Sequence, residues 1–221
     1  MIDKIVQDLD AAVAGIFDGA VILTSGFGGA GVPNPLLEAL RRQGARDLVI
    51  VGNNAGNGTH GLAGLMQDGR VRKVVCSYPR QADSFVFEEL YRTGKIELEL
   101  VPQGTLAERI RAAGAGLGGF YTKTSYGTEL AKGKEVREIN GEMYVLEPPL
   151  HGDFALVKAQ AADRWGNLVY RKAARNFGPP MAMAGKVTIA QVAEIVPLGQ
   201  LDPEHIVTPG IFVDRVVRVE A

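Results

Sequence analysis

The side chains best suited to chemistry in this sequence are uncharged amides. Asn53 and Asn54 follow the apolar run 48–51, and Gln103 follows the alternating run 96–101. Both runs predict β-strands, and the carboxyl ends of parallel strands meet at one edge of a sheet, where ligands bind. Amide N–H groups at that edge can stabilise negative charge that develops on an oxygen, and they introduce no competing base. The same amides can instead pin turns, because asparagine is a common turn residue.

No self-contained catalytic set accompanies these amides. His60, His151 and His205 lie far apart in the sequence and lack metal-ligand spacing, so no metal site is expected. No Gly-x-Ser-x-Gly elbow occurs, and neither Ser25 nor Ser77 has an identifiable paired base. For both serines, hydrogen bonding or packing is therefore favoured over nucleophilic attack.

A glycine-rich segment connects the first expected strand, 20–23, to a helix. Its glycines follow the Gly-x-Gly-x-x-Gly spacing of dinucleotide-binding loops, from Gly26 to Gly31. That function is disfavoured, because no acidic residue ends the next strand, where the ribose would need one. Pro33 and Pro35 also lie where a pyrophosphate would need free amides at the helix N-terminus. The loop can instead bring its backbone close to another ligand, or form a tight turn with no ligand.

Alternating strands and helices predict one α/β domain over residues 1–221, with a mainly parallel sheet flanked by helices. Asn34 is expected to cap the second helix, with Pro35 as its first residue, and Thr105 with Glu108 predicts a capping box. The expected helices cover 3–17, a segment from 34, 62–67, 84–93 and 105–113; the strands cover 20–23, 48–51, 71–77, 96–101, 154–160, 168–171, 186–196 and 215–219, and a hairpin turns at Asn140-Gly141.

Composition excludes several kinds of partner. The 24 basic and 25 acidic side chains nearly cancel, so neither nucleic acid nor an anionic membrane is expected to bind. No run approaches the ~20 apolar residues needed to span a bilayer, and the start lacks the features of a secretory signal, which predicts a cytoplasmic protein. The single cysteine, Cys76, cannot form an internal disulfide and is expected to be buried.

Several motifs occur in a fixed order along the chain. They are Asp18-Gly19 with Gly26-Phe27, Gly31 and Pro33, then Asn53-Asn54-Ala55-Gly56, and residues 102–109, 152–156 and 171–177. On these motifs the chain resembles the A-type, or alpha, subunit of the family I CoA-transferases over nearly its whole length. Thr24 and Ser25 depart from the family's pattern in the glycine loop.

The resemblance extends to one group within that family. Residues 74–81 and parts of 83–92 are most similar to the 3-oxoadipate CoA-transferases. These enzymes move CoA from succinyl-CoA to 3-oxoadipate late in the breakdown of aromatic compounds. Transfer to acetoacetate is the alternative.

The resemblance implies that the catalytic residue is absent from this chain. In the family the nucleophile toward the acyl-CoA thioester is a glutamate of the B-type, or beta, subunit, and no counterpart of its motif occurs here. A heterooligomer with a beta subunit is therefore expected, with a CoA thioester as substrate and no permanently bound cofactor. The implied CoA contacts are Thr24, Ser25, Gly26, Phe27, Gly28, Gly29 and Ala30, and the implied acyl and carboxylate pocket contains Asn53 and Gln103 first, with Asn54.

Four basic residues could bind anions. Arg80 follows the third strand and could hold the distal carboxylate of a dicarboxylic acyl group, although a solvated surface arginine is favoured there. Arg171, Lys172 and Arg175 could meet CoA phosphates or the beta subunit, but ion pairing is favoured for them. Two further functions stay open: a non-catalytic structural subunit, and a sugar-phosphate isomerase that acts alone, which would need its own acid-base pair and a basic phosphate pocket.

Overall fold

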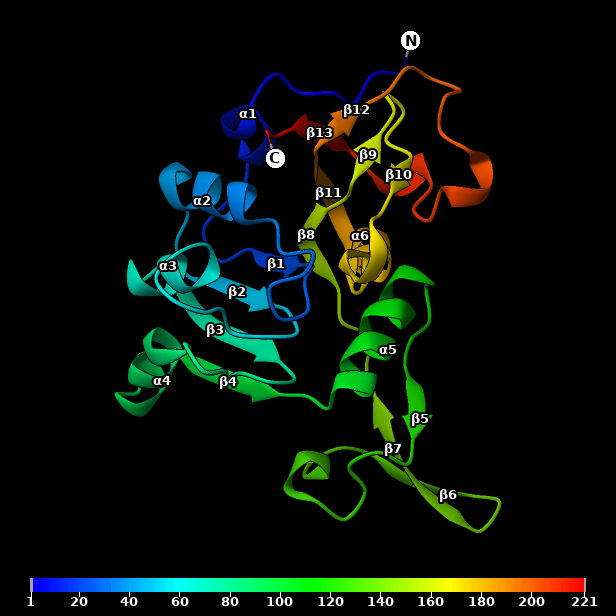
Figure 1. Cartoon of the computed structure of the whole chain (residues 1–221). Coiled ribbons are helices and arrows are strands. Elements are labelled where there is room, and N and C mark those ends of the chain that lie inside the picture. Colours follow the sequence, from blue (N-terminus) through cyan, green and yellow to red (C-terminus); the bar gives the residue numbers. More distant parts are fainter. Residues whose placement is uncertain (1, 221) are drawn as a thin grey trace.

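The computed structural model describes residues 2–220. Its main layer is a seven-stranded sheet of order β13-β11-β8-β1-β2-β3-β4, in which every neighbouring pair of strands is parallel. Helices cover both faces of the sheet, as Figure 1 shows. The predicted α/β class with a parallel sheet is confirmed. The strands of this sheet are β1 (Val21–Thr24), β2 (Leu48–Val51), β3 (Val71–Cys76), β4 (Glu97–Leu100), β8 (Gly152–Lys158), β11 (Gly185–Val192) and β13 (Arg215–Arg218).

Alternation of side chains along the strands supplies a hydrophobic core on each face. On β2, Leu48 and Ile50 belong to one core, whereas Val49 and Val51 belong to the other, because successive residues of a strand point to opposite sides. Four helices cover the first core and two cover the second, as an all-parallel sheet requires. The first four are α1 (Leu9–Val13), α2 (Asn34–Gln43), α3 (Leu62–Gln67) and α4 (Phe85–Arg92), and the other two are α5 (Gln103–Gly114) and α6 (Gly178–Ala184).

The strand order reverses beside β1. From β1 the chain runs through α2 to β2, whereas β8, on the other side of β1, leads by way of α6 to β11. Because α2 and α6 pack on opposite faces of the sheet, the segments after β1 and β8 diverge. Open α/β sheets bind ligands at such a switch point, at the carboxyl ends of the strands. The glycine loop after β1 starts there.

Two small sheets complete the fold. One has the order β5-β7-β6 and lies beyond α5 in Figure 1, and the other has the order β10-β9-β12. The predicted hairpin turn is confirmed, since Asn140 and Gly141 have φ of 53° and 78° between β6 and β7. The strands are β5 (Phe120–Thr122), β6 (Val136–Ile139), β7 (Glu142–Glu147), β9 (Ala161–Ala162), β10 (Leu168–Val169) and β12 (Glu194–Ile195), and the 3-10 turns are η1 (Glu129–Ala131), η2 (Lys172–Arg175), η3 (Pro203–His205) and η4 (Gly210–Phe212).

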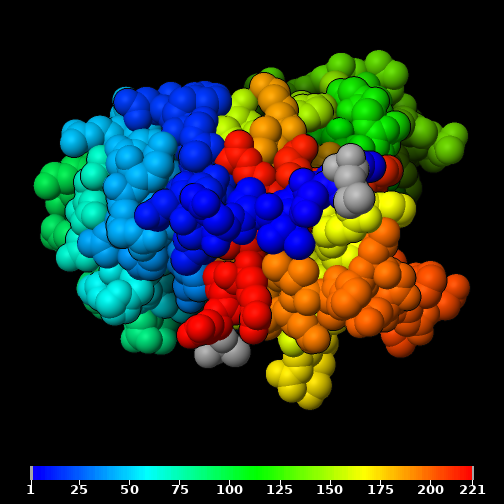
Figure 2. All heavy atoms as spheres, turned by 90° about the horizontal axis from the view of Figure 1, so that it is seen from above, coloured from blue at the N-terminus to red at the C-terminus, as the bar shows by residue number. Residues whose placement is uncertain are grey.

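The first helix is much shorter than its apolar spacing predicts. Helix α1 covers only Leu9–Val13, and it begins where the Asp8 carboxylate accepts a hydrogen bond from the Ala11 amide at 2.7 Å. Before the helix, Ile5 forms a parallel bridge with Val216 of β13. Figure 2 shows this N-terminal segment, in blue, beside the red C-terminal strand. The prediction of a helix over residues 3–17 is wrong, because pairing with β13 holds its start in an extended form.

Two predicted helix starts are also wrong. Helix α2 begins at Asn34 itself and has no side-chain cap, so Asn34 is a helical residue and not the cap. Helix α5 begins at Gln103, and Pro102, whose ψ of 138° is extended, is its N-cap residue. Thr105 lies inside the helix, and Glu108 binds Arg111 at 2.6 Å instead of returning to a cap.

Candidate active site

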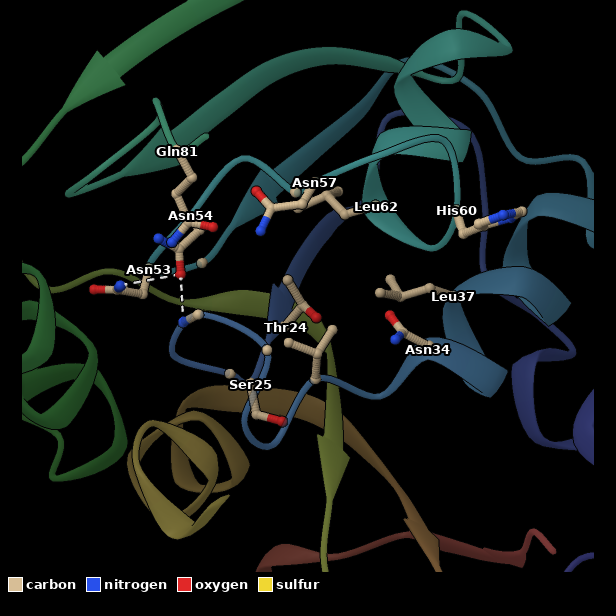
Figure 3. A pocket seen from close by; sticks show the side chains of 16 residues that line it. Thr24, Ser25, Asn34, Leu37, Asn53, Asn54, Asn57, His60, Leu62 and Gln81 are labelled. Carbon is tan, nitrogen blue, oxygen red and sulfur yellow. Dashed lines mark hydrogen bonds between the residues drawn. The ribbon is translucent and has the colours of Figure 1, made fainter. Parts of the chain in front are cut away.

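A cavity of about 150 Å³ lies at the carboxyl ends of β1 and β2, as Figure 3 shows. The glycine loop forms one wall, and the loop that follows β2 forms the opposite wall. Residues at the starts of α2 and α3 complete the lining. The polar side chains of the lining are Thr24, Ser25, Asn34, Asn53, Asn54, Asn57, His60 and Gln81.

Glycines give the loop after β1 its shape. Gly26 and Gly31 have φ of 131° and 76°, which side chains other than glycine rarely adopt. A Cβ on Gly31 would lie only 2.4 Å from the carbonyl oxygen of Ala174, so the loop also needs glycine for close packing. Between these glycines, Phe27 and Ala30 exchange backbone hydrogen bonds of 3.0 and 3.1 Å. The result is a tight turn with one side toward the cavity and the other against the segment 173–176.

Several backbone amides of this loop are already bound within the chain. The Asn176 side chain accepts from the Gly26 amide at 3.1 Å and donates to the Ala30 carbonyl at 2.9 Å. The Gly28 amide donates to Asn54 Oδ1 at 2.9 Å. These hydrogen bonds hold the loop rigid, but they leave few amides to surround a phosphate.

The side chains of Asn53 and Asn54 form one hydrogen-bonded network. Asn53 Oδ1 accepts from Ser77 Oγ at 2.7 Å and from Gln103 Nε2 at 2.9 Å. Asn53 Nδ2 donates at 3.2 Å to Asn54 Oδ1, which also accepts from the Gly28 amide (Figure 3). Both amide oxygens thus accept two hydrogen bonds. Each amide NH₂ group carries two hydrogens and makes one hydrogen bond within the chain, so N–H donors remain for a ligand.

The cavity lining carries almost no charge. Among the described residues, its only titratable side chain is His60. Ser25 Oγ donates to the Gly31 carbonyl at 2.7 Å and accepts from the Lys158 amide at 3.2 Å, which confirms a hydrogen-bonding role. Cys76 is fully buried, as predicted, and burial raises the pKa of its thiol to about 12, so it is not a nucleophile near neutral pH. The lining therefore suits neutral binding of an anionic oxygen.

Within residues 2–220, no group of three or more His, Cys, Asp and Glu side chains is placed to hold a metal ion. None of the helices in the same range combines the length and the hydropathy needed to cross a bilayer.

The sequence profile of the coenzyme A transferase family matches residues 6–219. The chain belongs to this family. It is 66% identical to the A subunit of 3-oxoadipate CoA-transferase from Pseudomonas putida, over 99% of this chain and 95% of that protein. It is 49% identical to the A subunit of the probable succinyl-CoA:3-ketoacid coenzyme A transferase from Bacillus subtilis, over 97% of this chain and 89% of that protein. The crystal structure of glutaconate coenzyme A-transferase from Acidaminococcus fermentans has the same fold, with a TM-score of 0.87 at 23% identity, over 98% of this chain and 76% of that one.

In this coenzyme A transferase chain, most of the predicted CoA contacts lie together at the cavity. Two do not line it: Phe27, whose side chain is half exposed at the tip of the loop, and Ala30, which closes the turn. The predicted contacts that line the cavity are Thr24, Ser25, Gly26, Gly28 and Gly29. Thr24 Oγ1 is buried and has no hydrogen-bond partner among the described residues, so it is a further donor toward the cavity.

The predicted acyl pocket is brought together only in part. Asn53 and Asn54 line the cavity, and Gln103 reaches it indirectly through its hydrogen bond to Asn53. Arg80 lies apart from them. Its side chain is 79% exposed in a groove beside α4, where its Nε lies 2.9 Å from Glu88 Oε1.

Several residues of this coenzyme A transferase site are not identified by local sequence signals. The sequence predicts Asn34 only as a cap, and nothing in it selects Asn57, His60 or Gln81, although all four line the cavity. Asn176 belongs to a family motif, but its contact with a loop about 150 residues earlier has no local signal.

The ion pairing favoured for the three basic residues near the second half of the sheet is wrong. Arg171, Lys172 and Arg175 form no ion pair within residues 2–220. The neighbourhood of the three in the sequence, residues 165–185, contains no aspartate or glutamate that could pair with them.

Proposed function

We propose that this chain is the alpha subunit of a CoA-transferase that moves CoA from succinyl-CoA to 3-oxoadipate, with the nucleophilic glutamate supplied by a partner beta subunit. The chain acts as one domain over residues 1–221, in the cytoplasm, on CoA thioesters and without a permanently bound cofactor. The observation that carries the proposal is the network of Asn53 and Asn54, which both line a cavity without carboxylates and keep spare N–H donors. Identity to the Pseudomonas putida protein supports the choice of acceptor.

The chemistry explains why neutral donors suit this site. When a carboxylate attacks a thioester carbonyl, negative charge builds on the carbonyl oxygen before the C–S bond breaks and CoA leaves as its thiolate. The products of that step are an acyl-glutamyl anhydride and free CoA thiolate. The thiolate then attacks the glutamyl carbonyl, the C–O bond of the anhydride breaks, succinate leaves as its carboxylate, and a glutamyl-CoA thioester forms. Donors held in place before the reaction stabilise the oxyanion without reorganisation. Asn53 Nδ2 and Asn54 Nδ2 are proposed for that role, with Thr24 Oγ1 as a further donor.

The composition of the cavity lining supports a nucleophile from another chain. Among the described residues, no aspartate or glutamate lines the cavity. Glu99 is held by Lys73 and Arg109, and Glu108 by Arg111, so each has a structural partner. A cavity that has oxyanion donors but no nucleophile needs a residue from a second chain to complete the active site.

Arg80 is retained as the proposed contact for the distal carboxylate of the acyl group. It would have to leave Glu88, and an exposed ion pair of this kind contributes little stability. The exposed guanidinium of Arg80 supports this role, because a carboxylate can bind it through two N–H donors. The position of Arg80 does not support it, since the residue lies outside the cavity lining.

The test is CoA transfer from succinyl-CoA to 3-oxoadipate and, separately, to acetoacetate, with this chain alone and with its candidate beta subunit. Transfer is expected only in the mixture and faster to 3-oxoadipate. Activity of the chain alone would place a nucleophile in this chain. Faster transfer to acetoacetate would assign the alternative acceptor, and no transfer in a verified complex would reject the proposal. A structural subunit would be recognised by full activity of a complex that carries Asn53→Ala.

A further inference from the structure

The cavity is too small for a whole CoA molecule. It holds about 150 Å³, whereas pockets that enclose a drug-sized ligand have volumes of about 300–1,000 Å³. If the proposed function is right, the cavity takes the thioester end, and the nucleotide end with its phosphates lies outside on the surface. Phosphates on a surface are bound by backbone amides or by cations.

Several of the amides that usually serve this purpose are occupied here. In the glycine loop, the amides of Gly26 and Gly28 donate to side chains of the chain itself. At the start of α2, Pro35 has no N–H, and the Leu36 amide donates to Gln191 Oε1 at 3.2 Å. These bound amides of the loop and of the helix N-terminus are not free for a phosphate, which favours cations as the phosphate ligands.

A group of cations lies directly behind the glycine loop. Arg171, Lys172 and Arg175 belong to η2 or precede it, all are exposed, and none has an ion-pair partner within the described residues. Their surroundings in the sequence do not offer one either, because residues 165–185 and 19–37 contain no aspartate or glutamate. Half of the 24 lysines and arginines, these three included, form no ion pair within the described residues, so the charge of these three is available to a ligand.

The same turn is physically joined to the cavity wall. Asn176, which follows η2, binds the Gly26 amide and the Ala30 carbonyl of the loop. Gly31 is in such close contact that a Cβ there would reach the Ala174 carbonyl. Lys172 has a φ of 50°, a conformation that lysine rarely adopts. Strain of this kind persists where surrounding contacts enforce it, and it is concentrated at functional sites.

The geometry points to Arg171, Lys172 and Arg175 as the binding site for the phosphates of CoA. The thioester end enters the cavity, the pantetheine arm crosses the glycine loop, and the nucleotide phosphates meet the three cations beyond it. The two guanidinium groups match phosphate oxygens with paired N–H donors, and the lysine adds a point charge. The inference rests on the proposed function, because it takes a CoA thioester as the occupant of the cavity.

The test compares two donors that differ only in the nucleotide: succinyl-CoA and succinyl-pantetheine, whose thioesters are identical. The variant is Arg171→Gln with Lys172→Gln and Arg175→Gln, in complex with the beta subunit. We expect kcat/KM for succinyl-CoA to fall at least about tenfold, mainly through KM, since one charge-assisted hydrogen bond is worth that ratio. The values for succinyl-pantetheine should not change. Higher salt should lower kcat/KM of the wild type for succinyl-CoA toward the value of the variant, because salt screens the attraction between cations and phosphates.

A matched control removes the same charges from the opposite edge of the sheet. Arg46, Arg72 and Lys95 are also exposed, lack ion pairs within the described residues, and lie at the amino ends of β2, β3 and β4. Arg46→Gln with Arg72→Gln and Lys95→Gln should leave both donors unaffected. Equal losses with the two donors, or failure of the η2 variant to form the complex with the beta subunit, would overturn the inference and assign the cations to the interface between the subunits.

Calorimetric binding of CoA and of pantetheine to the same complexes separates this inference from the proposed function, because it needs no turnover. Weaker binding of CoA alone by the η2 variant supports the phosphate site even if transfer to 3-oxoadipate is absent. Unchanged CoA binding overturns the site, even if the wild-type complex is an active transferase.

Discussion

Two regions of this chain bury polar side chains, and they do so by opposite means. At the cavity, Asn53 is 3% exposed and is held by uncharged partners alone. Between α5 and the β5-β7-β6 sheet, Glu147 is fully buried and is held by cations, with Lys134 Nζ at 2.5 Å and Arg109 Nε at 3.9 Å. Arg109 also binds Glu99 at 3.0 Å. We call Arg109, Glu99 and Glu147, with Lys73 and Lys134, the charged clamp.

The difference follows from what each region has to do. The clamp joins the small sheet to the main body, and its ions are useful only while every partner is present, because an unpaired buried charge is costly. The cavity must accept a charge that appears only during a reaction. Neutral amides with saturated oxygens and spare N–H groups can do so without a permanent charge to compensate. Charge therefore serves structure in one region and is kept out of the other.

The largest effect on stability is expected from breaking the clamp. Arg109→Met removes the cation that contacts both Glu99 and Glu147, and it leaves the buried Glu147 with Lys134 alone. We expect the free energy of unfolding to fall by about 3–5 kcal/mol, the usual cost of leaving a buried charge without its partner. Urea denaturation of the purified chain measures it.

The matched control is Arg111→Met, two positions along the same helix. Arg111 is half exposed and pairs only with Glu108 on the surface, so its loss should change the unfolding free energy by less than about 1 kcal/mol. Equal losses for the two variants would show that helix α5 responds to any lost charge and that the clamp has no special role.

The largest effect on catalysis is expected from placing a charge in the cavity. Asn53→Asp keeps an oxygen that can accept from Ser77 and Gln103, but it replaces the N–H donor by an anion. We expect kcat of the complex to fall about 100- to 1,000-fold, as when an oxyanion donor is removed. Steady-state kinetics with succinyl-CoA measures this.

Asn140→Asp is the control for this change. Asn140 lies in the hairpin turn with a φ of 53°, which aspartate also tolerates. The kcat of the complex that carries Asn140→Asp should match that of the wild type. If Asn53→Asp were equally active, the amides would only pin their loops, and the contrast between the two regions would lose its catalytic meaning.

Local sequence signals predict the cavity better than the clamp. The apolar strands and the glycine loop follow from residues close in the chain, and so does the gathering of Asn53 and Asn54 at the sheet edge. The partners Arg109 and Glu147 are 38 positions apart, and neither shows a pattern that favours the other over a surface charge. A sequence of mixed charge does not reveal which ions are buried.

Contacts between distant segments account for the remaining errors. Ile5 is extended because Val216 pairs with it, whereas its own neighbours predict a helix. Asn176 holds the glycine loop from the far end of the chain. Arg80 pairs with Glu88 of α4, a contact that its position after a strand does not indicate, and its role as a carboxylate contact stays a prediction. Local propensity is overridden wherever a tertiary partner is available.

The smallest expected effect is the contribution of Glu99 in the clamp to the pH dependence of stability. Partial burial of Glu99 favours its protonated form, but hydrogen bonds from Lys73 and Arg109 outweigh that and lower the pKa of Glu99 below its usual value. A lowered pKa gives stability that is complete above the unfolded value, about 4.3, and is lost as pH falls through the folded value. Urea denaturation between pH 6 and pH 3 should show the wild type losing more stability than Glu99→Gln.

Glu97 provides the reference for that slope. It lies on the same strand, is exposed, and has no ion pair within residues 2–220, so Glu97→Gln should keep the pH dependence of the wild type. If instead both variants lose the acid sensitivity equally, it arises from the net charge of β4 and not from the contacts of Glu99. The described lining of the cavity holds no carboxylate, so the cavity itself is expected to add nothing to the acid sensitivity of folding.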